Sequence, residues 1–361
     1  MNSENNVISW SAPADRDVCL CGIGARTPVG FSAAASAAAV RGAISAIAAH
    51  PVFVDKIGEP IALAQDAALN ADIEIGSRME QMVESAIAEA LGESLIDQSG
   101  PQIQCWIGLP EPRPGLPPEV GRSISLTLSN AFRIAPTEIH VLPRGHAAGL
   151  MAMQVAAQRI SSGAADLCVA AGVDSYHDIA TLKWLDLNGR LMSSKNRNGY
   201  PPSEGAGACV LASRSTADRY GLAILALVTA ATTCMEPHAI QSGEVCLGEG
   251  LTAALKEVSS SLQLPKEAIS ATYCDLNGER YRNEEFLYTL LRVQSAFVNA
   301  SDYICPADCW GDVGAASGPL FACLAVASGE RGYAKGLRPI LWAGSDSGHR
   351  TAVLLKLGDE S

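Results

Sequence analysis

Short apolar runs alternate with helical segments along most of the chain. Runs bounded by Gly, Pro or polar residues predict buried strands. The predicted strands are residues 18–23, 104–109, 139–142, 166–173, 209–212, 223–230, 271–276, 339–343 and 351–357. Their alternation with helices is typical of a layered α/β protein.

Two kinds of helix are predicted between these strands. Residues 78–91 repeat apolar residues every four positions, the pattern of a helix that packs one face on a core. Residues 147–161 and 315–328 consist mainly of Ala, Gly, Ser and apolar residues, which is typical of a helix buried in a core. Residues 250–262 and 284–295 predict further helices.

The two small-residue helices belong to two similar stretches. AAGLMAMQVAAQRISSG precedes a strand that reads DLCVAAG, and ASGPLFACLAVASG precedes one that reads PILWAG. This echo predicts a duplicated architecture in which each half carries a buried helix between strands. We divide the chain into an N-terminal tail (1–17), an N-terminal half (18–215) and a C-terminal half (216–361).

Composition narrows the classes of partner and compartment. The net charge of −12 disfavours nucleic acid and anionic membranes, because both attract basic surfaces. The first residues have neither the basic start nor the apolar core of a signal peptide, and no apolar run is long enough to span a bilayer. Eleven irregularly spaced cysteines fit reduced thiols, so we expect a cytoplasmic protein.

Four motifs, in order along the chain, carry a resemblance to a known family. They are VCLCGIGARTPVGFS, GHAAGLMAMQVAAQRISSGAADLCVAAGVDS, NRNGYPPSEGAGACVLASRSTADRYG and GDVGAASGPLFACLAVASG. Together they resemble the β-ketoacyl synthases of the thiolase superfamily, from about Val18 to the C-terminus. The resemblance implies the thiolase fold: two βαβαβαββ halves that form a five-layer α-β-α-β-α sandwich. It implies no cofactor and no metal.

The chain departs from this family at the positions that carry its chemistry. The family's nucleophilic cysteine, at the start of the first buried helix, matches His146 in GHAAG. Its two catalytic histidines match Asn277 and Asp312, and its lysine matches Ala307. The family's gate loop is replaced by GSDSGHRTA, which has no aromatic gate residue.

These replacements oppose carbon–carbon condensation, which needs a thioester-forming nucleophile and donors that stabilise an enolate. An acyl-imidazole on His146 is hydrolysed quickly, and an ionised Asp312 places negative charge where negative charge develops. Two such charges ~4 Å apart cost about 4 kcal/mol at an effective dielectric constant of about 20. That is a factor of roughly 10³ in rate.

Simpler interpretations of the same residues stay open. Asp312 can cap the N–H groups of the following helix, and His146 can be a neutral imidazole bonded to backbone. A third hypothesis is that His146 meets Asp312 or Asn277 and plugs the site. Cys274 or Cys309 can be a relocated nucleophile, or join His146 in a metal site, but buried core cysteines are commoner.

The resemblance therefore predicts a non-catalytic ketosynthase-like protein similar to a chain-length factor. It would act by binding, either as the partner subunit of an active ketosynthase or acyl carrier protein, or as an adaptor. Family members dimerise through the strand before the first buried helix, here residues 139–142, so a homodimer or heterodimer is expected. The alternative is an active acyl-transfer or hydrolytic enzyme with His146 as base and Asn277 as oxyanion donor.

Overall fold

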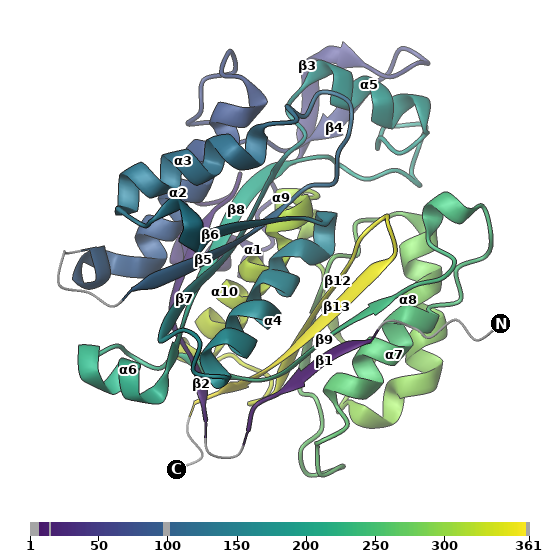
Figure 1. The fold of residues 1–361 in the computed structure, drawn as a ribbon. Helices are drawn as coiled ribbons and strands as arrows, with labels where there is room; N and C mark the ends of the chain where they lie inside the picture. The colour runs from purple at the N-terminus through teal and green to yellow at the C-terminus, as the bar shows by residue number, and fades with distance from the viewer. Residues whose placement is uncertain (1–6, 14–15, 97–101, 359–361) are drawn as a thin grey trace.

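Two helices of small residues lie at the centre of the molecule (Figure 1). They are α4 (Ala148–Ser161) and α10 (Ser317–Glu330). The computed structural model describes residues 7–13, 16–96 and 102–358. Gly149 lets the two helices touch, because a Cβ at this position would lie 2.5 Å from Pro319 Cδ and 2.7 Å from the carbonyl oxygen of Ala315. Both predicted central helices are confirmed.

The N-terminal half forms one side of the molecule. Its strands lie in the order β2-β8-β7-β5-β6. They are β2 (Val18–Arg26), β5 (Ile103–Leu109), β6 (Ile139–Pro143), β7 (Leu167–Ser175) and β8 (Glu204–Ser213). Two helices, α2 (Ile75–Ile96) and α3 (Val120–Phe132), pack apolar side chains on the outer face of these strands.

The C-terminal half repeats this arrangement. Its strands lie in the order β9-β13-β12-β10-β11. They are β9 (Ala226–Met235), β10 (Ala271–Cys274), β11 (Tyr303–Ile304), β12 (Pro339–Gly344) and β13 (His349–Leu357). Two helices, α7 (Glu249–Val258) and α8 (Arg280–Val293), cover the outer face. Each half thus reads βαβαβαββ, as predicted.

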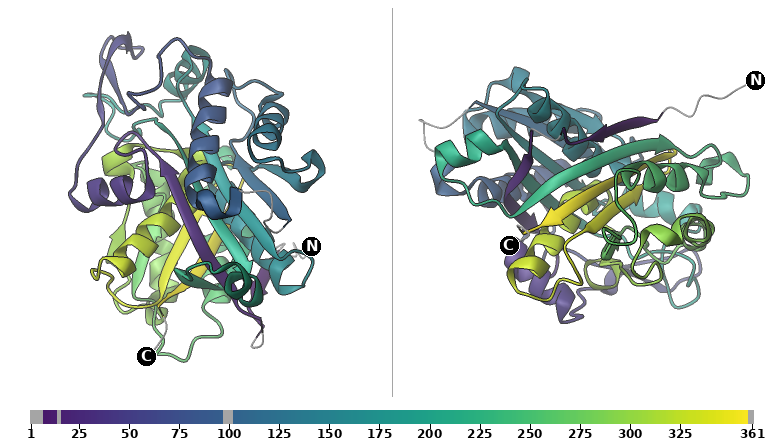
Figure 2. Two further views of the ribbon diagram at one scale, coloured as in Figure 1. Left: turned by 90° about the vertical axis from the view of Figure 1, so that its left-hand side faces the viewer. Right: turned by 90° about the horizontal axis from the view of Figure 1, so that it is seen from below.

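The layers follow from this duplication. The outer helices of the two halves lie on opposite faces of the molecule, with the strands between them (Figures 1 and 2). The largest apolar cluster fills the interior around α4 and α10, between the strands of both halves. The fold is therefore the predicted five-layer α-β-α-β-α sandwich. Val18–Leu20 of β2 also pair with residues 226–228 of β9, so the two half-sheets join into one hydrogen-bonded sheet.

Some elements differ from the sequence-based expectation. Residues 8–11, assigned to the N-terminal tail, form strand β1 (Ile8–Ser11), which pairs antiparallel with β9. This strand is mostly exposed, so its sequence has no buried apolar run to reveal it. Helix α3, the hairpin of β3 (Ala48–Val54) and β4 (Pro60–Leu63), and helix α5 (Ile179–Leu187) were also not predicted.

Three short helices complete the connections. Helix α1 (Ala33–Arg41) ends at Gly42. Helix α6 (Arg214–Tyr220) joins β8 to β9 and contains the proposed boundary between residues 215 and 216. Helix α9 (Ala307–Trp310) precedes the start of α10. Within the described ranges, no helix has the length and apolar character that crossing a membrane requires.

Candidate functional site

The fold brings the N-terminal ends of α4 and α10 together. His146 lies in a 3-10 turn (Gly145–Ala147) that leads into α4, and Asp312 lies just before the turn (Gly314–Ala316) that leads into α10. Nε2 of His146 lies 2.9 Å from Oδ1 and 3.0 Å from Oδ2 of Asp312. Only 6% of His146 and 3% of Asp312 is exposed.

Asn277 joins the same group from the loop after β10. Its Nδ2 donates to Oδ2 of Asp312 at 2.6 Å, and the backbone N–H of Gly314 donates to Oδ1 at 2.8 Å. The hypothesis that His146 meets Asp312 is therefore confirmed, with Asn277 as the third member. The capping interpretation of Asp312 is met only in part, because its carboxylate accepts from Gly314 in the turn before α10 and not from an N–H group of α10 itself.

Ala307, at the lysine position of the resemblance, is the first residue of α9 and is buried. It lines a cavity of about 10 Å³ together with Asn277, Asp312 and Phe321. Its methyl group supplies no charge or hydrogen bond there. All four residues singled out from the sequence are thus neighbours, although no observation assigns them a catalytic role.

Charge decides the protonation of the pair. Burial alone would lower the pKa of His146, but the nearby Asp312 carboxylate overcomes this and raises it above the ordinary value. Burial would likewise raise the pKa of Asp312, but His146, Arg282 and Asn277 hold it well below the ordinary value. Both pKa shifts favour an imidazolium paired with a carboxylate. Nε2 of His146 contacts this carboxylate and not a backbone group, which differs from the interpretation of an imidazole bonded to backbone.

A second set of buried charges surrounds this pair. Nη1 of Arg282 donates to Oδ2 of Asp275 at 2.9 Å and to the carbonyl oxygen of Gly344 at 2.8 Å. Oδ2 of Asp275 also accepts from the N–H of Gly344 at 2.9 Å. These bonds tie the loop after β10 to the end of β12, and so hold Asn277 in place.

Arg190 extends this network of buried charges. It forms two hydrogen bonds to Glu279, at 2.7 and 2.9 Å, and contacts Asp346. Asp346 also accepts from the hydroxyl of Tyr281 at 3.0 Å. Nearby, Nη2 of Arg113 donates to Oδ1 of Asp174 at 2.6 Å.

Sequence reasoning did not assign these surrounding residues to the site. Two segments of the sequence did indicate these residues. CDLNGERYRNEE is dense in charge, and GSDSGHRTA carries Asp346 where the family's gate loop belongs. Charges at such density between predicted core strands favour a buried network. Arg113 and Asp174 carried no comparable signal, because they lie far apart in the sequence.

Little free space remains around the pair. The cavity beside His146 measures about 60 Å³ and is lined by Arg113, Tyr176, Arg190 and Tyr200 among others. Ligand pockets usually measure about 300–1,000 Å³. Neither this cavity nor the smaller one beside Ala307 has room for an acyl chain. The site is filled by its own side chains.

The candidate cysteine nucleophiles do not join this network. Sγ of Cys274 donates to the carbonyl oxygen of Ile304 at 3.7 Å, and burial raises the pKa of this thiol. Burial also raises the pKa of Cys309. Both are therefore thiols rather than reactive thiolates.

The hypothesis that Cys274 or Cys309 joins His146 in a metal site gains no support either. In the described part of the chain, the one cluster with metal-ligand spacing is Glu236, Cys246 and Glu285. Both carboxylate oxygens of Glu285 already accept from Arg350, at 2.6 and 3.0 Å. The guanidinium of Arg350 thus lies against the carboxylate that a metal ion would need as a ligand.

One family model matches the segment of the chain that contains His146. Residues 145–217 match the family model described as "Beta-ketoacyl synthase, N-terminal domain". This segment of the chain is therefore similar to the N-terminal domain of the β-ketoacyl synthases. No curated protein matches it by sequence. The matched segment begins in the turn before α4 and ends in α6, and it contains the second of the four sequence motifs and most of the third.

Solved ketosynthase structures share the fold of this ketosynthase-like chain. The complex described as AntDE:AntF, a type II PKS acyl-carrier protein with its ketosynthase bound to the hexaketide, is 14% identical with a TM-score of 0.78. The alignment covers 95% of this chain and 100% of that chain. The ishigamide ketosynthase/chain length factor is 16% identical with a TM-score of 0.77, covering 96% and 100%.

A ketosynthase from a modular enzyme gives the same result. The ketosynthase from module 6 of the bacillaene synthase of Bacillus subtilis 168 is 11% identical with a TM-score of 0.78, and the alignment covers 96% of this chain and 72% of that chain. At these identities the likeness concerns the fold.

Proposed function

We propose that this ketosynthase-like protein acts by binding and does not catalyse carbon–carbon condensation. The observation that carries the proposal is the network of His146, Asp312 and Asn277, in which Nε2 of the histidine and the amide N–H of the asparagine are both directed at the Asp312 carboxylate. The small cavities beside the network support the same conclusion.

The network opposes catalysis in three ways. His146 has no thiol to hold an acyl group as a thioester, and its Nε2 is paired with Asp312. The amide of Asn277, the remaining donor, is directed at the same carboxylate. An enolate formed here would develop its charge beside ionised Asp312, which costs about 4 kcal/mol at ~4 Å and an effective dielectric constant of about 20.

The partner we propose is an active ketosynthase or an acyl carrier protein, as for a chain-length factor. Two of the similar structures are described as a ketosynthase/chain length factor and as an acyl-carrier protein with its ketosynthase. Strand β6, the expected pairing edge, is the terminal strand of its half-sheet and so offers backbone groups to a second chain. On this edge the rings of Trp106 and His140 stack with centroids 4.2 Å apart.

Co-purification tests the partner proposal. The full chain, co-expressed with an acyl carrier protein and an active ketosynthase from the same cells, should elute with one of them in size-exclusion chromatography. His140→Glu, which places a carboxylate on the β6 edge, should weaken the complex, whereas His238→Glu in the loop after β9 should not. A stable homodimer that elutes with neither protein would favour the adaptor role instead.

The alternative, an acyl-transfer or hydrolytic enzyme that uses His146 as base, makes a different prediction. Incubation with acyl-CoA and with a malonyl-loaded carrier protein should then release free thiol, and His146→Ala should abolish the release. We expect no release above background from either protein. None of the eleven cysteines, which all lie in the described ranges, forms a disulfide, and this suits the cytoplasm that we propose as its location.

A further inference from the structure

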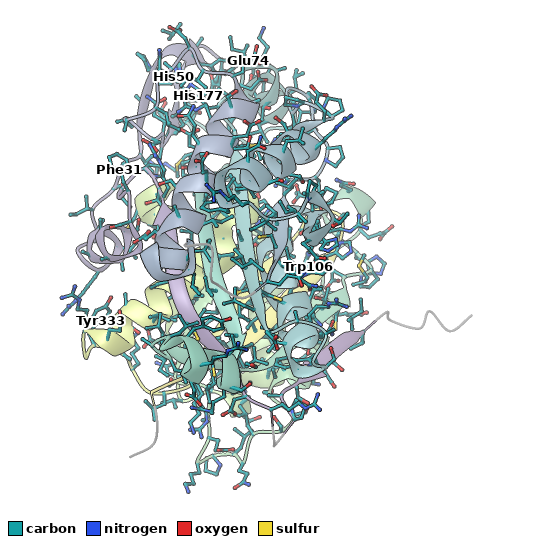
Figure 3. All side chains as sticks on the ribbon, turned by 60° about the vertical axis from the view of Figure 1, so that its left-hand side comes forward. Phe31, His50, Glu74, Trp106, His177 and Tyr333 are labelled. Atoms are coloured by element: carbon teal, nitrogen blue, oxygen red, sulfur yellow. The ribbon has the colours of Figure 1, made fainter. Side chains whose placement is uncertain are left out.

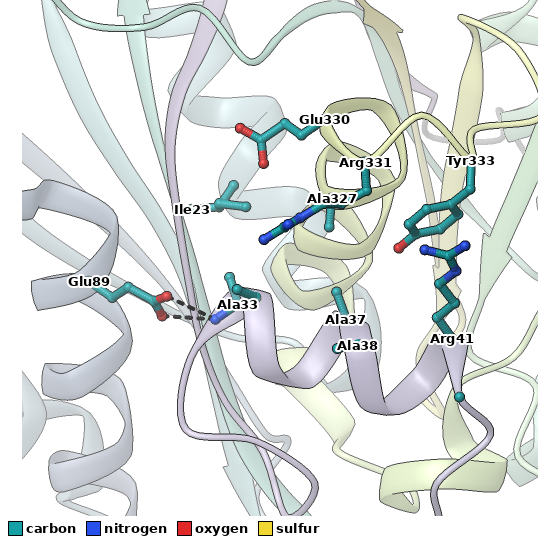
Figure 4. Close-up of a pocket in the computed structure, with 12 residues that line it drawn as sticks. Ile23, Ala33, Ala37, Ala38, Arg41, Glu89, Ala327, Glu330, Arg331 and Tyr333 are labelled. Atoms are coloured by element: carbon teal, nitrogen blue, oxygen red, sulfur yellow. Dashed lines mark hydrogen bonds between the residues drawn. The ribbon is translucent and has the colours of Figure 1, made fainter.

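A second, open pocket lies on the outside of the molecule, away from the filled centre. It lies between α1, the C-terminal end of α10, and single residues of β2 and α2 (Figure 4). Its volume is about 720 Å³, within the range of about 300–1,000 Å³ that is usual for ligand pockets. We call it the α1–α10 groove.

Small side chains leave this space empty. Ala33 and Ala37 lie one helical turn apart on α1, as do Ala34 and Ala38, so that α1 presents methyl groups to the groove. Ala327 of α10 faces them from the other side. Since none of these side chains reaches across the gap, the floor is apolar and unfilled.

Two arginines line the groove, and neither has a carboxylate partner among the described residues. The guanidinium of Arg331 points into the groove between Ile23 and Ala33 (Figure 4). Arg41 lies over the ring of Tyr333, with Cζ 4.1 Å from the ring centroid. Among the described residues, no carboxylate forms an ion pair with either arginine, in a chain whose net charge is −12.

The acidic residues of the groove do not offset these cations. Both oxygens of Glu89 are used by the fold, because they accept from the N–H groups of Ala25 at 2.8 Å and Ala33 at 2.9 Å. Glu330 is exposed at the rim. The groove thus combines an apolar floor with available positive charge, which is the chemistry that recognises an amphipathic anion.

We propose that the α1–α10 groove binds an organic anion with an apolar body, its acidic group at Arg331 and its body over the alanines. A carboxylate and a phosphate monoester share this chemistry. The inference does not rest on the proposed function, because the groove shares no residue with the filled centre. In Figure 3, Tyr333 lies on the opposite side of the view from Trp106, so pairing through β6 leaves the groove open.

Calorimetric titration of the full chain tests this proposal with three probes of equal length: decanoate, decyl phosphate and decanol. We expect the two anions to bind at least about tenfold more tightly than decanol, since charged hydrogen bonds to a guanidinium are the strong ones. The tighter of the two anions identifies the acidic group that the groove prefers. Binding should weaken as salt is raised.

Matched variants locate the binding. Ala38→Phe, an exposed groove position, should remove binding, whereas Ala35→Phe, exposed on α1 but outside the groove, should leave it unchanged. Arg331→Gln should weaken binding of the anions by about tenfold and leave decanol unaffected, and Arg331→Lys should restore part of the loss. Equal affinity for all three probes, no binding of any, or binding that survives both Ala38→Phe and Arg331→Gln would overturn the proposal.

Discussion

The centre of the molecule and the α1–α10 groove use charge in opposite ways. At the centre, His146, Asp312 and Arg282 all have oppositely charged partners, and the cavity beside them measures about 60 Å³. At the groove, Arg41 and Arg331 have no carboxylate partner among the described residues, and about 720 Å³ stays open. A likeness of fold therefore does not locate a usable site: charge pairing and free volume do.

The largest expected effect comes from breaking the central ion pair. Asp312→Ala leaves the imidazolium of His146 buried and takes away the acceptor of Asn277 and Gly314. We expect the free energy of unfolding to fall by about 3–5 kcal/mol, measured by urea denaturation. The matched control is Asp302→Asn, which breaks the exposed pair with Lys335 and should cost less than about 1 kcal/mol. Equal losses in both variants would contradict a buried charge pair.

Close packing of the central helices gives the next largest effect. Gly149→Ala adds a methyl group that meets Pro319 Cδ at 2.5 Å and the carbonyl oxygen of Ala315 at 2.7 Å. The backbones must then separate, so we expect a loss of about 1–3 kcal/mol in the free energy of unfolding. Thermal and urea denaturation measure it. A variant as stable as the wild type would show that α4 and α10 are less closely packed than described.

The pH dependence of stability sharpens the comparison further. The raised pKa of His146 stabilises the folded state fully below the ordinary value of 6.5, and this contribution is lost as pH rises through the folded value. The lowered pKa of Asp312 contributes above the ordinary value of 3.8 and is lost as pH falls through the folded value. The pair therefore stabilises most between these two ordinary values.

Comparison of the wild type with a variant that lacks the imidazole isolates this contribution to stability. The difference in unfolding free energy between the wild type and His146→Gln should be largest near pH 5 and shrink toward about pH 9. Urea denaturation at three pH values measures it. A difference that does not change with pH would mean that His146 carries no charge in the folded state.

The smallest effect is expected in the groove. Ala38→Phe places a ring in open space, so the free energy of unfolding should change by no more than about 0.5 kcal/mol. The same measurement as for Gly149→Ala checks it. A large loss would indicate that the groove is packed like the centre, which would also contradict its use as a binding site.

The order of the buried strands and of the two central helices followed directly from the sequence. Buried strands are continuous apolar runs, and the two central helices consist mainly of Ala, Gly, Ser and apolar residues, so periodicity alone placed β7, α4, α10 and β12 within a few residues. Exposed elements such as β1 gave no such signal, because a strand held by backbone pairing alone needs no apolar pattern. Position within the family motifs also pointed to His146, Asn277 and Asp312 as neighbours.

Tertiary structure alone determined the distances between these residues and the charge pairing that follows from them. His146 and Asp312 are 166 positions apart, and only the contact of α4 with α10 sets their atoms at 2.9 Å. That distance determines the charge of the imidazole, since the field of a buried carboxylate depends on separation and on the exclusion of water. The sequence determined which residues are present and which elements carry them. Whether a cavity is filled or open, and whether a charge is paired, depends on side chains that meet from distant elements.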